Sequence, residues 1–477
     1  MTILIGSVPG TEAMSYGNPS LSAMPLDRVL LAGRVEEYLA RTHWSRELLL
    51  THQQEALEQI LAYAVRASPF YRGSIGKLVA RHAPLTEYPV LTKSTLMANF
   101  DSVVTDARLS RAALEQHLSS NAAGDLFLNE YVVAATGGTT GERGVFAFDR
   151  EEWLSVIANI ARFQRLLGVT SETRNLGIGA PSPIHLSYRF YEEMRAVRPD
   201  APAISVITPM EKVVEALNRY QPEIFSSYPS FIRLLVEEQR AGRLSISPRI
   251  VRSVAETLTE DVATLIRETW GAAVNNGYAA TEFGVFGMGC REVPGIHVAE
   301  DLVVFEVVDK DNHPVPAGTA GAKVLVTSLE NRTIPLIRYE LSDIVTMAHE
   351  PCACGSSFAR IDKIEGRQEE VLQLPGKHGG IIEVHAIRLR SPLIAAPGVK
   401  QFQLFLNGDE LEVAITIAAG FEPEVTRRET TGLLLNALRK LNVGDVHLNV
   451  RVVDAIPRTG GGAKQKLVAT QKKTPKS

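Results

Sequence analysis

The chain has 477 residues, which predicts roughly two to four domains and leaves ample length for a large hydrophobic core. Hydrophobic residues make up 45% and charged residues 22% of the sequence, a globular composition that excludes disorder along the whole chain. The 50 basic and 54 acidic residues nearly balance, so no global charge attracts nucleic acid or an acidic membrane surface. We therefore expect a small-molecule partner, with no nucleic acid and no membrane.

The N-terminal segment contains no basic residue before Arg28 and no long apolar run, so it does not have the layout of a secretory signal. No apolar run approaches the roughly 18 residues that span a bilayer. The three cysteines, Cys290, Cys352 and Cys354, are an odd number, which argues against a disulfide framework. These features predict a cytoplasmic protein whose cysteines have another use.

The predicted elements begin after residues 1–44, which we interpret as a loose or docked N-terminal extension. Apolar residues from Ser45 to Ala67 recur at intervals of three and four, as in one face of a packing helix. Between residues 170 and 282, five short apolar stretches (at 176, 203, 223, 250 and 273) alternate with helix-like segments. This alternation predicts βαβ units and a mainly parallel sheet flanked by helices, with ligands at the carboxyl ends of the strands.

From Asp301 the pattern changes to successive strands, which predicts a β-rich subdomain at about residues 290–366. The segment after Gly366 contains a hairpin signal at Asn407-Gly408, a helical stretch at 431–441 and a strand in HLNVRVVD. We therefore predict an α/β protein with a large domain at 45–366 and a small α+β C-terminal domain at 367–477.

A loop rich in glycine and threonine follows an apolar strand at Tyr131 and precedes another that ends at Phe148. Glycines allow the backbone to approach a polyanion, backbone N–H groups and threonine hydroxyls donate to phosphate oxygens, and Arg143 adds a positive charge. A glycine-rich turn alone is more often an ordinary turn. The phosphate-binding candidates are Thr136, Gly137, Gly138, Thr139, Thr140, Gly141 and Arg143.

With the motifs that follow it, this loop resembles the pyrophosphate loop of the adenylate-forming acyl- and aryl-CoA ligases, in the phenylacetate-CoA ligase-like branch. The later segments, in chain order, are YAATE at Tyr278–Glu282, PLIRY at Pro335–Tyr339 followed by Asp343, GRQE at Gly366–Glu369, and PRT at Pro457–Thr459 followed by Lys464. The resemblance extends from about Ser45 to Lys466. It implies that Tyr278 and Thr281 contact the nucleotide.

The resemblance also assigns roles to charged residues. It implies that Glu282 helps to hold the Mg²⁺ of ATP, that Asp343 binds the ribose hydroxyls and that Glu369 lies in a hinge between the two domains. Lys464 is the implied catalytic lysine, and Arg367 is implied to bind the nucleotide and to take part in catalysis. These roles suit the reaction, because a carboxylate that attacks the α-phosphate of ATP needs cations and N–H donors around the phosphorus.

Several positions differ from the family pattern. Ala255-Glu256, which is implied to lie near the adenine, has alanine where the family usually has glycine, and Glu369 takes a place that is often aspartate. Ala463 replaces the glycine before the lysine. The assignment of Lys464 leaves Lys466 open as the alternative.

The cysteines and one histidine form a candidate metal site. Cys290 and His297 make a C-x₆-H pair, and Cys352 and Cys354 form a C-x-C turn that ends in Gly355. Three sulfurs and one imidazole match a closed tetrahedral structural zinc site, and the family branch often shows the same pattern. Buried free cysteines are the alternative.

The pocket for the acid is expected after the predicted strands. His185 and Tyr228 follow two of these stretches, and Gly277 precedes the YAATE segment. A histidine packed in the core is the more common outcome, so contact of His185 with the substrate stays open.

The motifs together predict an enzyme that activates a carboxylic acid, most often an aryl acid, as an acyl-AMP and transfers the acyl group to coenzyme A. The expected cofactors are ATP, Mg²⁺ and a structural Zn²⁺, and a homodimer is compatible with the sequence. Two alternatives remain: transfer to an amine, an alcohol or a carrier-protein thiol, and a catalytically silent binding protein with the same fold. The charged set of Glu282, Asp343, Arg367 and Lys464 argues against the silent protein.

Overall fold

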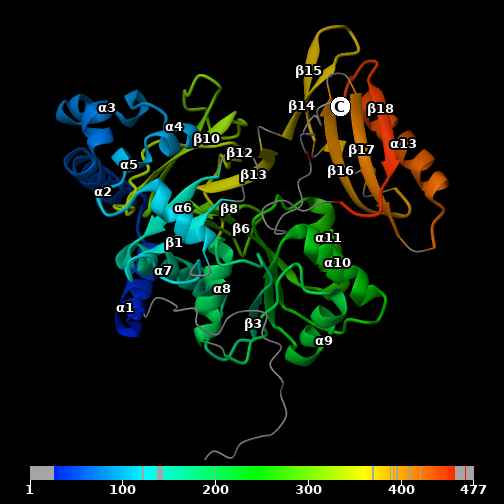
Figure 1. Cartoon of the computed structure of the whole chain (residues 1–477), viewed down its shortest axis with the longest axis horizontal. Coiled ribbons are helices and arrows are strands. Elements are labelled where there is room, and N and C mark those ends of the chain that lie inside the picture. Colours follow the sequence, from blue (N-terminus) through cyan, green and yellow to red (C-terminus); the bar gives the residue numbers. More distant parts are fainter. Residues whose placement is uncertain are drawn as a thin grey trace, which may run out of the picture.

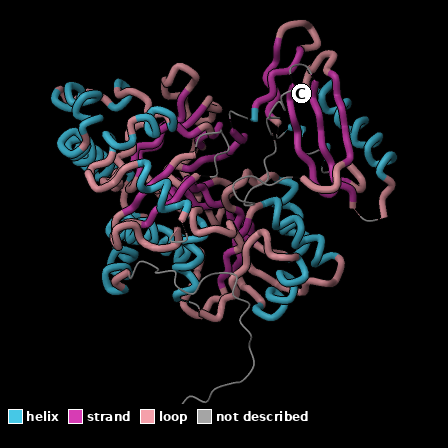
Figure 2. Tube along the Cα trace, viewed as in Figure 1, coloured by secondary structure: helices cyan, strands magenta, loops and turns pink. Residues whose placement is uncertain are grey.

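The computed structural model describes residues 26–120, 123–136, 143–197, 199–367, 370–386, 388–389, 392–393, 396–407, 410–418, 420–456 and 468. Figure 1 shows a large body that contains α1 to α11, beside a smaller body formed by β14 to β18 and α13. In Figure 2 the strands of the large body lie between helices, whereas those of the small body carry one long helix on one side. Among the helices of these described residues, none is long and apolar enough to cross a membrane.

The N-terminal third is mostly helical, and the predicted helix at 45–67 is confirmed. Ser45 accepts a hydrogen bond from the backbone N–H of Leu48 and caps the second helix. Residues 28–41 of the predicted extension form α1, whose Arg34 donates to Ser155 of α7, so this part of the extension is docked. The helices are α1 (Arg28–Arg41), α2 (Arg46–Ala67), α3 (Pro69–Ala80), α4 (Lys93–Ala98), α5 (Phe100–Val103), α6 (Arg111–Ser119) and α7 (Arg150–Leu166).

An eight-stranded sheet with the order β12-β13-β8-β7-β6-β5-β4-β3 forms the centre of the large body. Four adjacent strands are parallel, β3 (Asn175–Gly177), β4 (Ile224–Ser227), β5 (Ile250–Ser253) and β6 (Ala273–Ala280). The helices of this half are α8 (Leu186–Val197), α9 (Met210–Tyr220), α10 (Pro229–Arg240) and α11 (Glu260–Trp270). The predicted α/β class with a parallel sheet is confirmed.

The apolar stretch at 203–209 is not a strand of this sheet, contrary to the alternating pattern. Its backbone makes a single parallel bridge, between Ser205 and Gly179. Ser205 and Thr208 instead close a turn, in which the N–H of Thr208 donates to the carbonyl of Ser205 and the N–H of Ser205 donates to the Thr208 hydroxyl. These bonds use the backbone groups that a strand ladder would need.

The strands expected in a separate β-rich subdomain divide between two sheets. A three-stranded antiparallel sheet contains β9 (Val303–Val308), β10 (Lys323–Ser328) and β11 (Tyr339–Leu341). The large sheet instead continues through β7 (Gly284–Gly289), β8 (Ile296–Val298), β13 (Arg360–Arg367) and β12 (Asp343–Met347), all antiparallel. A separate hairpin is formed by β1 (Val132–Ala135) and β2 (Val145–Phe148).

The C-terminal body contains the predicted hairpin, helix and strand. Here β16 (Val399–Asn407) pairs with β17 (Glu410–Ile417), which also pairs in parallel with β18 (His447–Val452). The helix α13 (Pro423–Lys440) begins earlier than expected, and β14 (Val371–Pro375) pairs with β15 (Ile381–His385). Its buried core consists of residues between 372 and 450, such as Leu374 and Leu434. The division at residues 366 and 367 stays a prediction.

A buried ion pair joins α1, α7 and the turn before Val303. Arg162 of α7 is fully buried, and its Nη1 lies 2.8 Å from Oδ2 of Asp301, whose side chain is also buried. The same guanidinium donates to the backbone carbonyl of Tyr38 in α1 and to Asn159. Burial removes both charges from water, so each depends on the other for compensation.

We predict that Asp301→Ala lowers the free energy of unfolding by about 3–5 kcal/mol, because the charge of Arg162 stays buried without a carboxylate. Arg41, which also faces Asp301, keeps its ion pair with Glu37. The double variant Arg162→Met, Asp301→Leu should lose much less stability, because no unpaired charge remains. Urea denaturation of both variants measures the difference, and an equal loss in the two would contradict this account.

Candidate active site

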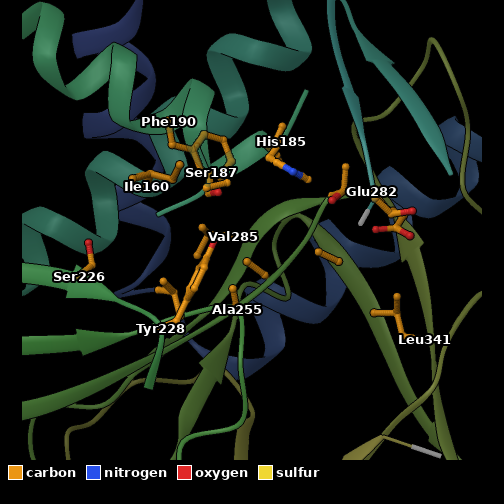
Figure 3. A pocket seen from close by; sticks show the side chains of 18 of the residues that line it. Ile160, His185, Ser187, Phe190, Ser226, Tyr228, Ala255, Glu282, Val285 and Leu341 are labelled. Carbon is orange, nitrogen blue, oxygen red and sulfur yellow. The ribbon is translucent and has the colours of Figure 1, made fainter. Parts of the chain in front are cut away.

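A cavity of about 300 Å³ lies where strands β4, β5 and β6 end, next to β11, β12 and the end of β13. The carboxyl ends of parallel strands leave such a space because the chain turns away from the sheet into helices. Figure 3 shows side chains from several elements directed into it. The sequence-predicted residues that line the cavity are Thr136, His185, Tyr228, Ala255, Gly277, Thr281, Glu282, Asp343 and Arg367.

The predicted ribose-binding aspartate and the predicted catalytic arginine lie opposite each other. Asp343 is the first residue of β12 and pairs in register with Arg367, the last residue of β13. Nε of Arg367 lies 3.5 Å from Oδ1 of Asp343. Tyr278 is buried nearby, and burial together with the charge of Asp343 raises the pKa of its phenol well above the ordinary value. Tyr278 itself does not line the cavity.

Glu282 lies in the turn after β6 and is nearly fully buried. The hydroxyl of Tyr339 donates to its Oε1 over 2.9 Å, and Nζ of Lys93 lies 4.0 Å from the same oxygen. Lys93 and Tyr339 both line the cavity, yet sequence reasoning assigned no function to Lys93. Thr92 caps the helix that begins at Lys93, so the sequence could indicate a helix start here. It could not indicate that this helix lies beside Glu282.

The ends of the glycine-rich loop are held together. Backbone N–H and carbonyl groups join Thr136 and Gly144, and the Thr136 hydroxyl accepts a further bond from the N–H of Gly144 over 2.9 Å. The loop residues Gly137, Gly138, Thr139, Thr140 and Gly141 lie outside the described residues. Among the side chains that are described, the buried Nη2 of Arg143 finds no hydrogen-bond partner.

Ala255 and Glu256 follow β5 and differ in their positions. Ala255 lines the cavity with a φ of 66°, a left-handed conformation that glycine adopts more easily. The carboxylate of Glu256 does not line it. This carboxylate accepts hydrogen bonds of 3.0 Å from both the N–H and the hydroxyl of Ser230, at the start of α10. The observed contact of Glu256 is therefore with a helix terminus.

The three residues predicted for the acid pocket come from three elements. His185 precedes α8, Tyr228 is the N-terminal capping residue of α10, and Gly277 lies within β6. Figure 3 places His185 near Glu282 and Tyr228 near Ala255 and Val285. His185 and Tyr228 are both buried. The structure thus brings these residues to one cavity but spreads them along it.

The three cysteines and His297 lie close together in the structure, although Cys290 and Cys352 are 62 positions apart in the sequence. The ligand atoms of Cys290, His297, Cys352 and Cys354 all lie within 4.8 Å of one another. The Sγ atoms of Cys290 and Cys352 are 3.5 Å apart, and Sγ of Cys354 lies 3.3 Å from Nε2 of His297. Nδ1 of His297 lies 3.0 Å from the carbonyl oxygen of Phe358, which fixes the ring with Nε2 toward the sulfurs.

Two predicted functional residues, Lys464 and Glu369, lie outside the described residues. Sequence reasoning also missed Arg252 of β5, which lines the cavity. Its apolar neighbours in IVRSVAE gave a strand signal but no functional signal. A cavity lined by carboxylates and by basic side chains at the end of a parallel sheet defines an enzyme class that binds a charged small molecule.

Comparison with known proteins gives the family. The sequence profile of the AMP-binding enzymes matches residues 85–327, just over half of the 477 residues. The chain belongs to this family, and the predicted adenylate-forming superfamily is confirmed. A curated relative, a phenylacetate-coenzyme A ligase from Thermus thermophilus, is 25% identical over 470 residues, which cover 90% of this chain and 98% of the relative.

Solved structures show the same fold. A 2-hydroxyisobutyryl-CoA ligase in its postadenylation state, in complex with 2-HIB-AMP, gives a TM-score of 0.70 at 19% identity over 88% of this chain and 89% of that chain. The same ligase with 2-HIB-AMP and CoA in its thioesterification state gives 0.58 at 19% identity over 91% of each chain. Both matches show the fold, and the TM-score is higher for the postadenylation structure.

Proposed function

We propose that the protein activates a carboxylic acid with ATP and then transfers the acyl group to the thiol of coenzyme A. In the first step a carboxylate oxygen attacks the α-phosphorus, the bond to the β-phosphate oxygen breaks, and pyrophosphate leaves with its electron pair. In the second step the thiol releases its proton to water, its sulfur attacks the acyl carbon, the bond from this carbon to the AMP oxygen breaks, and AMP leaves with the electron pair. The convergence of Glu282, Asp343 and Arg367 on one cavity, reached from separate parts of the chain, carries this proposal.

The residues around the cavity fit ATP. The carboxylate of Asp343 offers two oxygens to two ribose hydroxyls, and Arg367 beside it adds positive charge. Arg143 does not line the cavity, but its unpartnered Nη2, next to the glycine-rich loop, is a donor that a phosphate oxygen would satisfy. Glu282 supplies the hard oxygen ligand that Mg²⁺ prefers, and bound Mg²⁺ would offset the negative charge of the phosphates.

Lys93, which the sequence did not indicate, is a further residue that we assign to the nucleotide site. Its ammonium stands 4.0 Å from Glu282, at a point where the phosphates would otherwise meet a buried carboxylate. A cation there reduces the repulsion between this carboxylate and the nucleotide. We assign Lys93 to phosphate binding and keep Lys464 as the catalytic lysine.

Coenzyme A is the favoured acceptor because the Thermus thermophilus relative is a phenylacetate-coenzyme A ligase and aligns over nearly the whole chain. That relative does not support the alternative, in which the acyl group is transferred to an amine, an alcohol or a carrier-protein thiol. A preference for aryl acids, a cytoplasmic location and a homodimer stay predictions of the sequence.

The hinge also stays a proposal, with Glu369 as its candidate. The strand β13 ends at Arg367 and β14 begins at Val371, so the chain passes between the two bodies within this short segment. The two bodies have separate cores. The lysine loop must reach the phosphates in the first step, and the thiol must reach the acyl carbon in the second. Rotation of the C-terminal body at this segment would let one active site serve both reactions.

A structural zinc ion is the proposed occupant of the cysteine cluster. Ligands about 2.0–2.3 Å from a tetrahedral zinc lie roughly 3.5–3.8 Å apart, close to the 3.5 Å between Cys290 and Cys352 and the 3.3 Å between Cys354 and His297. The bond from Nδ1 of His297 to a backbone carbonyl is the usual orientation of a metal-binding histidine. The ion would join the loop after β7 to the segment before β13.

We predict that Lys464→Ala slows acid-dependent pyrophosphate release by about 10²–10³-fold, because this charge stabilises the transition state of the first step. The measurement is pyrophosphate release across a panel of acids, with and without coenzyme A. Lys466→Ala is the matched control and should keep most of the activity. The assignment fails if Lys464→Ala retains near-normal release or if Lys466→Ala loses it instead.

We also predict about one zinc per chain by elemental analysis of protein purified without chelators. His297→Ala should lose the metal and lower the melting temperature, because the closed site contributes to folding. His349→Ala, an exposed histidine in the same region that is not part of the cluster, should retain the metal. Metal-free wild-type protein would mean that the cysteines only pack together.

A further inference from the structure

A buried arginine with no carboxylate partner among the described residues lines the cavity. Arg252 is the third residue of β5 and is 5% exposed. In the sheet it is flanked by Ser226 of β4 and Asn275 of β6, which are its partners in register. Its side chain therefore lies on the face of the parallel sheet that borders the cavity.

The guanidinium is only partly satisfied. Nη2 donates to the side-chain oxygen of Asn175 over 2.8 Å, whereas the buried Nε has no hydrogen-bond partner. Within the described part of the chain, no carboxylate forms an ion pair with Arg252, in contrast to Arg162, which is held by Asp301. Burial lowers the pKa of Arg252 to about 10, so the group is still charged at neutral pH. A buried charge with one neutral partner is unfavourable unless a ligand compensates it.

Arg252 is paired in register with Ser226, which lies at the end of the cavity remote from Glu282. Figure 3 shows Ser226, its neighbour in register, across the cavity from Glu282, with Tyr228, Ala255 and Val285 between them. Glu282 and Asp343 mark the nucleotide end by the roles proposed above. An acid whose carboxylate reacts there would extend its other end toward Arg252.

Apart from Arg252, the residues that line this end of the cavity are mostly apolar and closely packed. The ring of Tyr191 lies directly on the sheet at Gly177, where an added Cβ would approach a ring carbon to 2.0 Å. Gln164 also lines the cavity, and its amide nitrogen lies 3.6 Å from the sulfur of Met194. An arginine and a glutamine in the lining of an otherwise mostly apolar pocket are suited to fix one polar group of a ligand.

We propose that the acid substrate carries a second anionic oxygen group at the end remote from the reacting carboxylate, and that Arg252 binds this group. The inference rests on the proposed function and names the substrate class as dicarboxylic acids or acids with an equivalent distal oxyanion. Arginine presents several N–H donors in a planar fork, which matches a carboxylate. A monoacid of the same shape leaves the guanidinium buried and uncompensated, so it is a poor substrate.

The test compares matched acids in the wild-type protein by pyrophosphate release, with adipate against hexanoate and terephthalate against 4-methylbenzoate. The diacid of the preferred pair should have a kcat/KM at least about a hundredfold higher, because the monoacid lacks the group that the buried donors need. In Arg252→Met this preference should disappear or reverse, and Arg252→Lys should keep part of it. Arg249→Met, on the same segment but bonded to backbone carbonyls outside the cavity, should leave the preference unchanged.

Equal kcat/KM values for diacid and monoacid in the wild type would overturn the inference, while the pyrophosphate release itself would still support the proposed function. An equal loss for both acids in Arg252→Met would also overturn it, because that result describes a structural arginine. Absence of acid-dependent pyrophosphate release for every acid in the panel would contradict the proposed function. The wild-type comparison decides the inference even if Arg252→Met does not fold.

Discussion

The antiparallel pairing of β12 with β13 is the constraint on which the rest of the site depends. It places Asp343 opposite Arg367 at the edge of the eight-stranded sheet, where the chain leaves for the C-terminal body. The strand β13 also pairs with β8, which carries His297. One strand therefore connects the end of the cavity at Asp343 and Arg367, the exit to the C-terminal body and the cysteine cluster. A shift of its register by one residue would displace all three.

Two buried arginines differ in what compensates their charge. Arg162 is held by Asp301 and by further hydrogen bonds, so its charge is compensated within the protein. Arg252 has a neutral partner in Asn175 and borders a cavity. The same residue type thus stabilises the fold at one place and recognises a ligand at the other. The distinction depends on the neighbouring carboxylate, which belongs to a distant part of the chain.

The features that could be predicted from the sequence are those that depend on local residue spacing, turn residues and the order of the motifs. The helix that Ser45 caps, the parallel strands of the βαβ units and the Asn407 hairpin follow from spacing and turn residues, and motif order led to Glu282 and Asp343. It did not reveal the pairing of β12 with β13, because antiparallel strands of two sheets carry the same alternation. Lys93 and Arg252 were missed for a related reason: their importance comes from what folding brings beside them.

The most direct measurement follows the oxygen atoms of the acid. The reaction is run with coenzyme A and an acid whose carboxylate carries ¹⁸O at both positions. If a carboxylate oxygen attacks the α-phosphorus and the thiol then attacks the acyl carbon, AMP gains one labelled oxygen and the thioester retains the other. Unlabelled AMP, or label in inorganic phosphate, would contradict an acyl-AMP intermediate and with it the central claim that this chain is an adenylate-forming ligase.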